Sequence, residues 1–585
     1  MRATNPMLGL TENPMKPNRQ TAMETINSRL DHNVRHTSNE WYFPVESRSL
    51  TLEALREHSL KLASVLRELG LRKRDRVALM MTNSSSYAIT LLALWRLNTV
   101  AVPLRPRGNL QTRYADYVRH CDRICDFRLM LFDDSTTGEV LEQAALSNRP
   151  HACVGALLAT AEQAPLFAGD CAIRDEDIAV LQFSSGSTGA PKGVIVTHGM
   201  IMAQLQNLHY NHISSRRGRP VESMASWMPL NHDMGLFMGV LTPLYTGCSH
   251  MLASPAFYMR NPPRWFSLMS QRHVDLNFST NSVLASTLKI LRRLYKQDDI
   301  DLSGLHLYIG AEKVSPLIVR RCYEVLTPLG FKSQHLHIGY GMAENALGAA
   351  CTKTESITLQ WFRFTGPNCL EPVQKEEQGG LELVAVGGVD WRHEITIRDK
   401  AGRPLPDLTL GEIAISSPCV TSGYYSNADK TAEKLIDGRL LTGDIGFIYH
   451  DELYFYARQD DMIISAGRNV IPDDIELAVE ELPFMRAGGS ALIGVDNPQT
   501  GCIDLVLLAE VHEHSSRDEL TGYRQAIQEA GYESGDIILN RIIFCQRGSV
   551  EKTSSGKKRR TVIRKRFIND QINRVEGCNE QHAVV

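Results

Sequence analysis

One short segment combines the residue types that bind phosphate groups. Residues 184–193 read SSGSTGAPKG and contain three glycines, four hydroxyl residues and Lys192, directly after the apolar segment 178–183. Glycines let the backbone come close to an anion, and the hydroxyl groups, backbone N–H groups and lysine supply donors to a polyphosphate. Because Gly193 follows Lys192, the spacing is not that of a P-loop. The segment predicts an anion-binding loop at the end of a strand, with a solvated Gly/Ser loop as the simpler alternative.

Two further segments set carboxylates beside a histidine or a tyrosine. The pair His232-Asp233 lies within the otherwise apolar residues 228–236, where polar groups are costly unless they are hydrogen-bonded or used in chemistry. On this segment alone, a hydrogen-bonded turn is the simpler interpretation. In residues 337–344 a predicted strand ends at Tyr340, and Glu344 follows it. The tyrosine ring could stack on a base, and the carboxylate could bind Mg²⁺.

The C-terminal third contains three more candidate segments. Residues 441–444 read LTGD, and a carboxylate after a tight turn suits a ribose diol, because it accepts from both hydroxyls. Residues 457–464 read ARQDDMII, and residues 552–560 read KTSSGKKRR. The basic run is either a nucleic-acid patch or a solvated terminus. It has no interleaved aromatic residue and the chain has no basic excess, so we expect no nucleic-acid partner.

The elements that must position these residues follow from periodicity. Apolar residues at helical spacing over 52–69, with Gly70 at the C-cap, predict a helix. A strand over 76–81, a helix over 88–97 and a strand over 99–104 follow, and such alternation implies a parallel sheet with crossover helices. Short alternating segments around 383–425 predict a small β-rich subdomain, and about 110 residues after 458 have their own β/α alternation.

Composition and length limit the possible classes. A chain of 585 residues is too long for one core, and its 43% hydrophobic and 22% charged residues are ordinary for a globular protein. The net charge of −3 gives no drive toward nucleic acid or anionic membrane. The longest near-apolar run, 88–104, contains Arg96, Asn98 and Pro103, so we expect no transmembrane segment. The polar residues 1–29 lack a hydrophobic signal core, so we expect a cytoplasmic protein.

Taken together and in this order, the six segments resemble the motifs of the adenylate-forming superfamily of acyl-CoA synthetases, stand-alone adenylation domains and luciferases. The resemblance covers about residues 48–568. In that family a carboxylate attacks the α-phosphorus of ATP to give acyl-AMP and pyrophosphate, and a thiol then usually displaces AMP. The resemblance implies an α/β fold in which a large N-terminal domain of parallel αβ-layered sheets with a small β-rich subdomain precedes a small, mobile α+β C-terminal domain.

Composition, periodicity and the resemblance together give domain bounds. Residues 1–45 are polar without clear periodicity, so we expect a loosely ordered lead-in there, followed by a large domain over 46–457 with its β-rich subdomain at about 383–457, and a C-terminal domain over 458–585. Asp460 matches the hinge about which the small domain turns between the two half-reactions. That rotation would withdraw Lys557 and bring the Gly467 loop to the site.

The resemblance assigns roles residue by residue. Lys557 matches the catalytic lysine, with Lys558 as the neighbouring alternative, and Glu344 and His232 are the other candidate catalytic residues. Thr188 and Glu344 would place Mg²⁺. The residues expected to bind ATP are Ser184, Ser185, Gly186, Ser187, Thr188, Gly189 and Lys192 at the phosphates, Gly310, Ala311, Glu312, Tyr340, Gly341, Met342 and Ala343 around the adenine, and Asp444 and Arg458 at the ribose.

Three details resemble the fatty-acyl-AMP ligase branch. Residues 231–236 read NHDMGL, Ala343 stands where most CoA ligases have threonine, and about 40 residues separate Glu344 from Gly387. The extra residues, about 351–378, resemble an insertion that hinders the use of CoA, although a surface loop is the alternative. The implied acceptor is the phosphopantetheine arm of an acyl carrier protein in lipid or polyketide biosynthesis.

Other functions stay open on the sequence. They are a ligase that uses free CoA, an adenylation enzyme for a short or functionalised acid of a natural-product pathway, and a nucleotide-binding pseudoenzyme that acts as a scaffold. The segment 278–282, FSTNS, lacks the Gly-Gly-Pro-Asn run of the family, so the pocket around 230–240 and 278–282 leaves the acid undefined.

Overall fold

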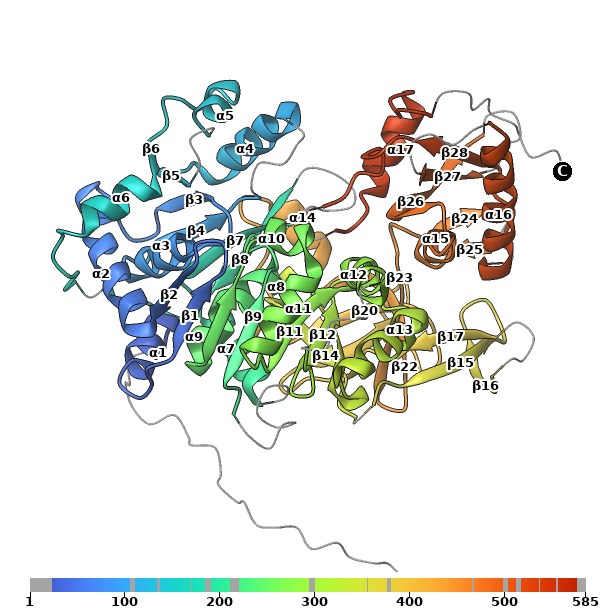
Figure 1. Cartoon of the computed structure of the whole chain (residues 1–585), viewed down its shortest axis with the longest axis horizontal. Helices are drawn as coiled ribbons and strands as arrows, with labels where there is room; N and C mark the ends of the chain where they lie inside the picture. The colour runs from blue at the N-terminus through green and yellow to red at the C-terminus, as the bar shows by residue number, and fades with distance from the viewer. Residues whose placement is uncertain are drawn as a thin grey trace, which may run out of the picture.

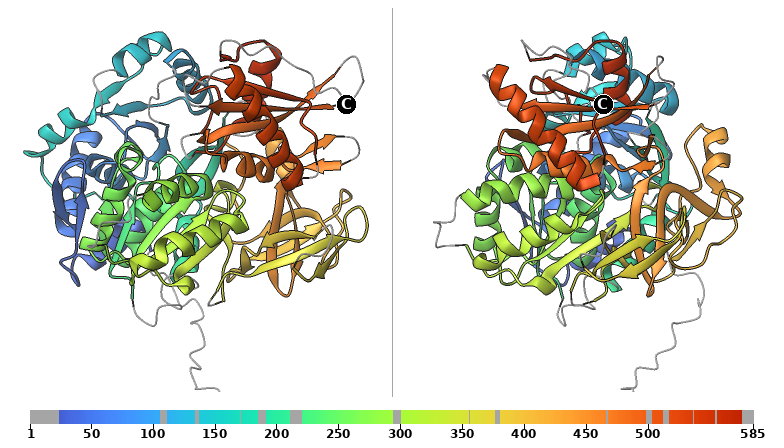
Figure 2. Two further views of the ribbon diagram at one scale, coloured as in Figure 1. Left: turned by 45° about the vertical axis from the view of Figure 1, so that its right-hand side comes forward. Right: turned by 90° about the vertical axis from the view of Figure 1, so that its right-hand side faces the viewer.

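The computed structural model describes most of the chain in two unequal parts (Figure 1). The described residues are 24–105, 111–133, 137–169, 171–184, 191–210, 220–293, 300–354, 356–375, 380–465, 468–497, 503–511, 517–535, 537–553 and 556–575. The large N-terminal domain contains two main sheets and a small third one, and the small C-terminal domain lies beside α12 and above the sheet β15–β17. The turned views of Figure 2 show the same arrangement.

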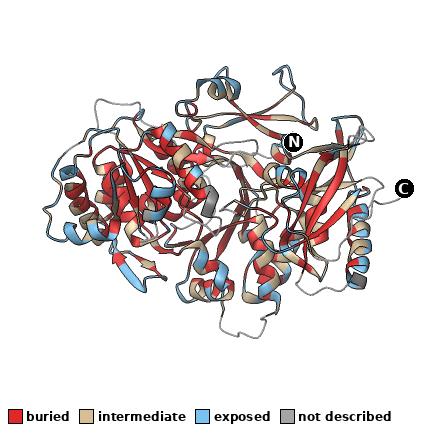
Figure 3. Cartoon of the chain, turned by 90° about the horizontal axis from the view of Figure 1, so that it is seen from above, coloured by how far each residue is buried: buried red, intermediate tan, exposed pale blue. Residues whose placement is uncertain are grey.

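The first main sheet carries the predicted anion-binding segment at its end. Its order is β6-β5-β3-β4-β7-β8, and every neighbouring pair is parallel except β7 and β8. Burial of the central strands on both faces accounts for their apolar sequences (Figure 3). The strands are β3 Arg76–Met80, β4 Val100–Pro103, β5 Leu129–Phe132, β6 His151–Cys153, β7 Ile178–Ser184 and β8 Lys192–Thr197.

The second main sheet is mixed and has fourteen strands in the described part of the chain. Strands β13, β12, β11, β9, β10 and β1 are parallel neighbours in that order, and antiparallel strands extend the sheet from β13 through β14 to β19. The strands are β1 Glu40–Phe43, β2 Arg48–Thr51, β9 Ser223–Ser226, β10 Ser249–Leu252, β11 Leu276–Thr280, β12 His306–Gly310, β13 Leu336–Gly341, β14 Gly348–Cys351, β18 Gly387–Val389, β19 Glu394–Arg398, β20 Gly411–Ser416, β21 Leu435–Ile436, β22 Arg439–Tyr449 and β23 Glu452–Arg458.

Helices cover these sheets, and α2 and α3 begin where the sequence supplies an N-cap. Thr51 and Ser84 each accept a hydrogen bond from the first turn of the helix that follows. The helices are α1 Ile26–Asn33, α2 Leu52–Glu68, α3 Ser85–Arg96, α4 Gln111–Cys125, α5 Thr137–Gln143, α6 Val154–Ala161, α7 His198–Leu208, α8 Asp233–Leu236, α9 Thr242–Thr246, α10 Pro255–Arg260, α11 Pro262–Gln271, α12 Asn281–Arg293, α13 Pro316–Leu326 and α14 Ala428–Lys434. The helices predicted over 52–69 and 88–97 and the strand predicted over 76–81 are thereby confirmed within a few residues. Among the described helices, none has the length and apolarity that crossing a membrane requires.

The expected loosely ordered lead-in is wrong for its second half. Thr25 caps α1, Leu30 is fully buried, and Asn33 Nδ2 donates to the Leu244 carbonyl at 2.7 Å. Strand β1 then pairs with β10. The partners of these residues lie about 200 positions away in the chain, so a polar local composition gave no sign of them.

Part of the expected extra segment 351–378 supplies two strands of a small sheet. Strands β15 Leu359–Phe364, β16 Leu370–Val373 and β17 Leu381–Val384 pair antiparallel in the order β16-β15-β17. Phe362 is fully buried and its ring meets those of Phe447 and Tyr454 edge-on, at centroid distances of 5.0 and 5.1 Å. This packing fastens the small sheet to β22 and β23.

The small C-terminal domain has the β/α alternation that the sequence predicts. Strand β26 pairs antiparallel with β27, and β27 pairs parallel with β28. Helix α15 packs on β26, and α17 packs on the same strand. The elements are β24 Ile463–Ser465, β25 Arg468–Val470, α15 Pro472–Glu480, β26 Met485–Asp496, β27 Ile503–Val511, α16 Arg517–Gly535, β28 Arg541–Cys545 and α17 Arg560–Ile568.

Candidate active site

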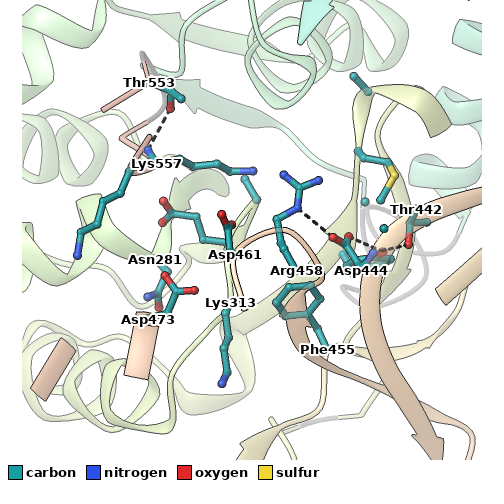
Figure 4. Close-up of a pocket in the computed structure, with 18 of the residues that line it drawn as sticks. Asn281, Lys313, Thr442, Asp444, Phe455, Arg458, Asp461, Asp473, Thr553 and Lys557 are labelled. Carbon is teal, nitrogen blue, oxygen red and sulfur yellow. Dashed lines mark hydrogen bonds and ion pairs between the residues drawn. The ribbon is translucent and has the colours of Figure 1, made fainter. Parts of the chain in front are cut away.

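A cavity of about 650 Å³ lies where the two domains face each other. It collects residues from strand ends of both main sheets, from α8 and α14, and from α15 and residues 552–560 of the C-terminal domain. Figure 4 shows Asp444, Thr442 and Arg458 on one side of it and Lys557 on the other. The predicted site residues that line it are Lys192, His232, Ala311, Glu312, Tyr340, Gly341, Met342, Ala343, Glu344, Asp444, Arg458, Asp460 and Lys557.

The remaining predicted residues have other positions. Gly310 ends β12 and Ser184 ends β7, next to the cavity-lining residues Ala311 and Phe183. Ser185, Gly186, Ser187, Thr188 and Gly189 lie outside the described residues, as does Gly467.

Antiparallel pairing of β22 and β23 builds one end of the cavity. The register sets Asp444 directly opposite Arg458, and Arg458 Nε donates to Asp444 Oδ1 at 3.0 Å. The hydroxyl of Tyr340, at the end of β13, donates to Asp444 Oδ2 at 2.8 Å. The Asp444 charge raises the pKa of Arg458, and burial together with that charge raises the pKa of Tyr340. Each carboxylate oxygen keeps a second lone pair, so Asp444 can still accept from a diol.

A tight turn after β13 presents Glu344. A Cβ on Gly341 would lie 1.8 Å from the Leu347 carbonyl oxygen, so this position of the chain accommodates only glycine. Glu344 Oε1 accepts from the Tyr424 hydroxyl at 2.9 Å, and the Glu344 carbonyl accepts from Thr421 N at 2.7 Å. The carboxylate is therefore held at the cavity wall, where it is a suitable ligand for a hard cation.

The cavity end near β8 carries a cluster of lysines. Lys192 pairs in register with Ser184, and its ammonium lies 5.8 Å from the ring centroid of Tyr424. Lys430 and Lys434 of α14 also line the cavity. Burial, with the nearby Lys430 charge, lowers the pKa of Lys192. Glu433 also lines this end and pairs with Lys430, so the three lysines leave an excess of positive charge, which suits a polyphosphate. Sequence reasoning missed the two lysines of α14, because they belong to no motif and only folding brings them to the site.

Buried titratable groups surround the opposite part of the cavity. His232 precedes α8, and burial, with the Lys557 charge, lowers its pKa to about 4. Burial raises the pKa of Asp233 and of Glu312, and the Lys557 ammonium counteracts both shifts. Glu312 is held by Ser282, whose backbone N–H and hydroxyl donate to it at 2.8 and 3.1 Å. All three groups sense Lys557, so its charge reaches into this part of the cavity.

The structure separates the two adjacent lysines that the sequence left as alternatives. Lys558 Nζ lies 2.8 Å from a carboxylate oxygen of Glu476 and 2.8 Å from one of Glu480. Lys557 donates its backbone N–H to Thr553 Oγ1 at 3.0 Å, and its charge acts on His232, Asp233 and Glu312 of the cavity wall. Successive side chains of an extended segment point to opposite sides, which accounts for the different surroundings. Lys557 is therefore the lysine that is available to a bound molecule.

Beyond His232 the cavity continues toward α12. Gln182 is 98% buried there and donates to the Asn231 carbonyl at 2.9 Å. Met228, Met234 and Ala285 add apolar surface. Asn231, Met234, Asn281 and Ser282 lie within the two segments from which the sequence predicts an acid pocket. Behind them Trp227 and Tyr258 stack at 4.2 Å between ring centroids.

Comparisons with known proteins agree with this geometry. The model of the AMP-binding enzyme family matches residues 30–425. The chain is 28% identical over 566 residues to the long-chain-fatty-acid–AMP ligase FadD26 of Mycobacterium tuberculosis (strain ATCC 25618 / H37Rv), covering 90% of this chain and 93% of that protein. It is 26% identical over 545 residues to the 4-hydroxyphenylalkanoate adenylyltransferase of Mycobacterium marinum, with coverage of 86% and 83%.

A solved structure extends the similarity to the fold. A chain from a structural and functional study of fatty acyl-adenylate ligases from E. coli and L. pneumophila superposes with a TM-score of 0.83 at 26% identity. The match covers 94% of this chain and 98% of the other. The likeness therefore spans both domains.

Proposed function

This chain belongs to the AMP-binding enzyme family, and from that premise we propose that it joins a carboxylic acid to AMP at the expense of ATP and passes the acyl group to a thiol. One observation carries the proposal: a single cavity contains Asp444 and Tyr340 at one end, the lysine cluster at another, and Lys557 beside the apolar end. Such a cavity can hold a nucleotide and an acid with their reacting groups together.

The residues of the site suit this reaction without a protein nucleophile. A carboxylate oxygen of the acid attacks the α-phosphorus, and the bond from that phosphorus to the bridging oxygen breaks as pyrophosphate leaves. Lys557 would follow the negative charge between the carboxylate and the α-phosphate, because a compact ammonium on a flexible stem can do so. Asp444 and Arg458 would orient the ribose, and Lys192 with the loop 184–189 would hold the leaving phosphates. His232, neutral at physiological pH because of its lowered pKa, would pack beside the acid without adding charge.

We propose Mg²⁺ as the cofactor, held by Glu344 and Thr188. The Glu344 carboxylate fits this role because Tyr424 orients it at the cavity wall and its oxygens are hard ligands. The ion would supply positive charge to the phosphate oxygens.

We propose the phosphopantetheine arm of an acyl carrier protein as the acceptor. The sheet β15–β17 supports this choice over free CoA, because part of it lies in the segment that resembles an insertion hindering the use of CoA. FadD26 is named as an AMP ligase and another relative, FadD21 of Mycobacterium tuberculosis, as a putative CoA ligase, so the acceptor is tested directly below. Asp460, in the turn after β23, is our candidate for the hinge between the two half-reactions. The relatives are named for different acids, a long-chain fatty acid and a 4-hydroxyphenylalkanoate, so the test below uses acids of several classes.

The first experiment tests acyl-AMP formation. The enzyme is given ATP, Mg²⁺ and a panel of straight-chain, hydroxy and aryl acids, and acid-dependent ATP–pyrophosphate exchange is measured, with acyl-AMP identified by mass spectrometry. We expect exchange with at least one acid. No exchange with any acid would contradict the proposal and favour a nucleotide-binding scaffold.

The second experiment tests the acceptor. The acid that gives exchange is incubated with either CoA or a holo-acyl carrier protein, and the thioester product is identified by mass spectrometry. We expect acyl transfer to the carrier. Efficient acyl-CoA formation would replace the carrier with free CoA.

A further inference from the structure

Basic side chains of the large domain form ion pairs at both ends of helix α15 in the small domain. Lys313 Nζ lies 2.9 and 2.8 Å from the two carboxylate oxygens of Asp474, in the first turn of α15. Arg321 of α13 pairs with Glu481, the residue after α15, and Lys289 of α12 lies 3.6 Å from the same carboxylate. We call these contacts the α15 clamp.

We propose that Lys313 and Arg321 are positioning residues, which hold α15 and thereby present Lys557 to the acid and the α-phosphate. This inference rests on the proposed acyl-AMP formation and adds to it two residues that act through α15: Lys313, at the cavity wall, and Arg321, outside the cavity lining. It also explains why a lysine directly follows Gly310-Ala311-Glu312, a segment expected to bind the nucleotide.

The Lys313–Asp474 ion pair is well placed to hold α15 against the large domain. The side chain of Lys313 is 7% exposed, so solvent and salt screen the pair less than a surface ion pair. Both oxygens of Asp474 are engaged, which defines the direction of α15 as well as its distance. Lys313 also lies 5.7 Å from the ring centroid of Tyr456 on β23, so its stem is packed in the large domain.

The second contact restrains the other end of the helix. Cations are favourable where Arg321 and Lys289 lie, because the C-terminal end of a helix carries partial negative charge. Lys289 donates a hydrogen bond to the Glu480 carbonyl as well. Two points of attachment, one at each end of α15, restrain rotation of the small domain, which one contact would allow.

Helix α15 is linked in turn to the segment that carries Lys557. Glu476 and Glu480 of α15 form ion pairs with Lys558, the residue that follows Lys557. Glu476 also accepts hydrogen bonds from Arg560 at 2.7 and 3.1 Å. Burial would lower the pKa of Lys558, but the two carboxylates outweigh it and raise that pKa, so the pairs stay ionised. The clamp, α15 and the Lys557 segment therefore form one continuous series of contacts.

Two single variants and an exchanged pair test the clamp. Lys313→Met and Asp474→Asn each remove one charge at similar size, and Lys313→Asp combined with Asp474→Lys exchanges the partners. Arg292→Gln is the matched control, because Arg292 lies on α12 but pairs with Glu324, within the large domain, at 3.2 Å.

Each half-reaction is measured separately in these proteins. For the single variants we expect acid-dependent pyrophosphate exchange to fall about 10-fold, since close charge pairs at interfaces couple by at least this much. Transfer from purified acyl-AMP to the carrier protein should be unchanged or faster, because it does not need this domain arrangement. The exchanged pair should recover most of the exchange activity. Equal losses in both half-reactions, or no loss in either, would overturn the inference.

A measurement that does not depend on enzyme activity distinguishes this inference from the proposed function. Small-angle X-ray scattering should give a larger radius of gyration for Lys313→Met and Asp474→Asn than for the wild type and Arg292→Gln, because the small domain is released. If no acid supports exchange but the scattering changes as expected, the proposed function fails and the clamp remains. If exchange is normal and the scattering is unchanged in the single variants, the clamp fails and the proposed function remains.

Discussion

Replacing the adjacent lysines 557 and 558 one at a time should separate chemistry from stability. Lys558 is 12% exposed and makes two 2.8 Å contacts, and one of its partners, Glu476, is 1% exposed. Lys558→Ala would leave Glu480 without its closest cation and Glu476 with Arg560 alone, which costs about 3 kcal/mol of unfolding free energy, the lower end of the range for breaking a buried pair. In the described part of the chain, Lys557 has no carboxylate within 4.0 Å, so Lys557→Ala should change stability by less than about 0.5 kcal/mol.

The activities should show the reverse order. Lys557→Ala removes an electrostatic contact made in the transition state, and such a loss costs about 100- to 1000-fold in rate. ATP binding should be nearly unchanged, because the residues that would hold the nucleotide are elsewhere in the cavity. Lys558→Ala should retain most of its activity at temperatures where it is folded.

The measurements are thermal and denaturant unfolding, acid-dependent pyrophosphate exchange, and ATP binding by calorimetry. Lys565→Ala, at an exposed position of α17, is the control for loss of a lysine charge. A fully active Lys557→Ala, or a Lys558→Ala protein with wild-type stability and no exchange, would refute the assignment of these two residues.

Three further outcomes follow from particular contacts. Gly341→Ala should abolish exchange, because its Cβ would meet a backbone carbonyl oxygen at 1.8 Å and displace the turn that presents Glu344. Gly348→Ala is the tolerated control, because its Cβ would have its nearest contact at 3.6 Å and Gly348 is not among the residues that line the cavity; equal activities would contradict this account. His198, which is buried, has its pKa lowered by burial from 6.5 to about 4, so unfolding takes up a proton between these values and stability should fall by up to about 3 kcal/mol as the pH drops through them. Thermal melts of wild type and His198→Gln across that range check this, and parallel pH profiles would count against it. Phe362→Ala should cost about 3–5 kcal/mol and expose the sheet β15–β17 to proteases, whereas Phe364→Ala, at a 40% exposed position, should not.

The sequence by itself determined the local elements and the residue types of the site. Helix α2 and strand β3 could be predicted because the signals for them, the spacing of apolar residues and the capping residues, lie within the elements or directly beside them. The candidate residues at Tyr340, Asp444 and Lys557 were found from short motifs, and all three line the cavity. The pairing of Asp444 with Arg458 needs only a tight antiparallel turn, so their closeness in the sequence already favoured it.

Tertiary structure decided what depends on distant partners. Helix α1 is held in place by contacts with the region of α9, about 200 residues away in the sequence. The two lysines of α14 lie at the cavity only because of the tertiary fold. Nothing near Lys313 in the sequence indicates that Asp474 is its partner, because about 160 residues separate them. Local spacing encodes helices, strands and motifs, whereas a site built at the contact of two domains depends on long-range packing, which one sequence read in short windows does not contain.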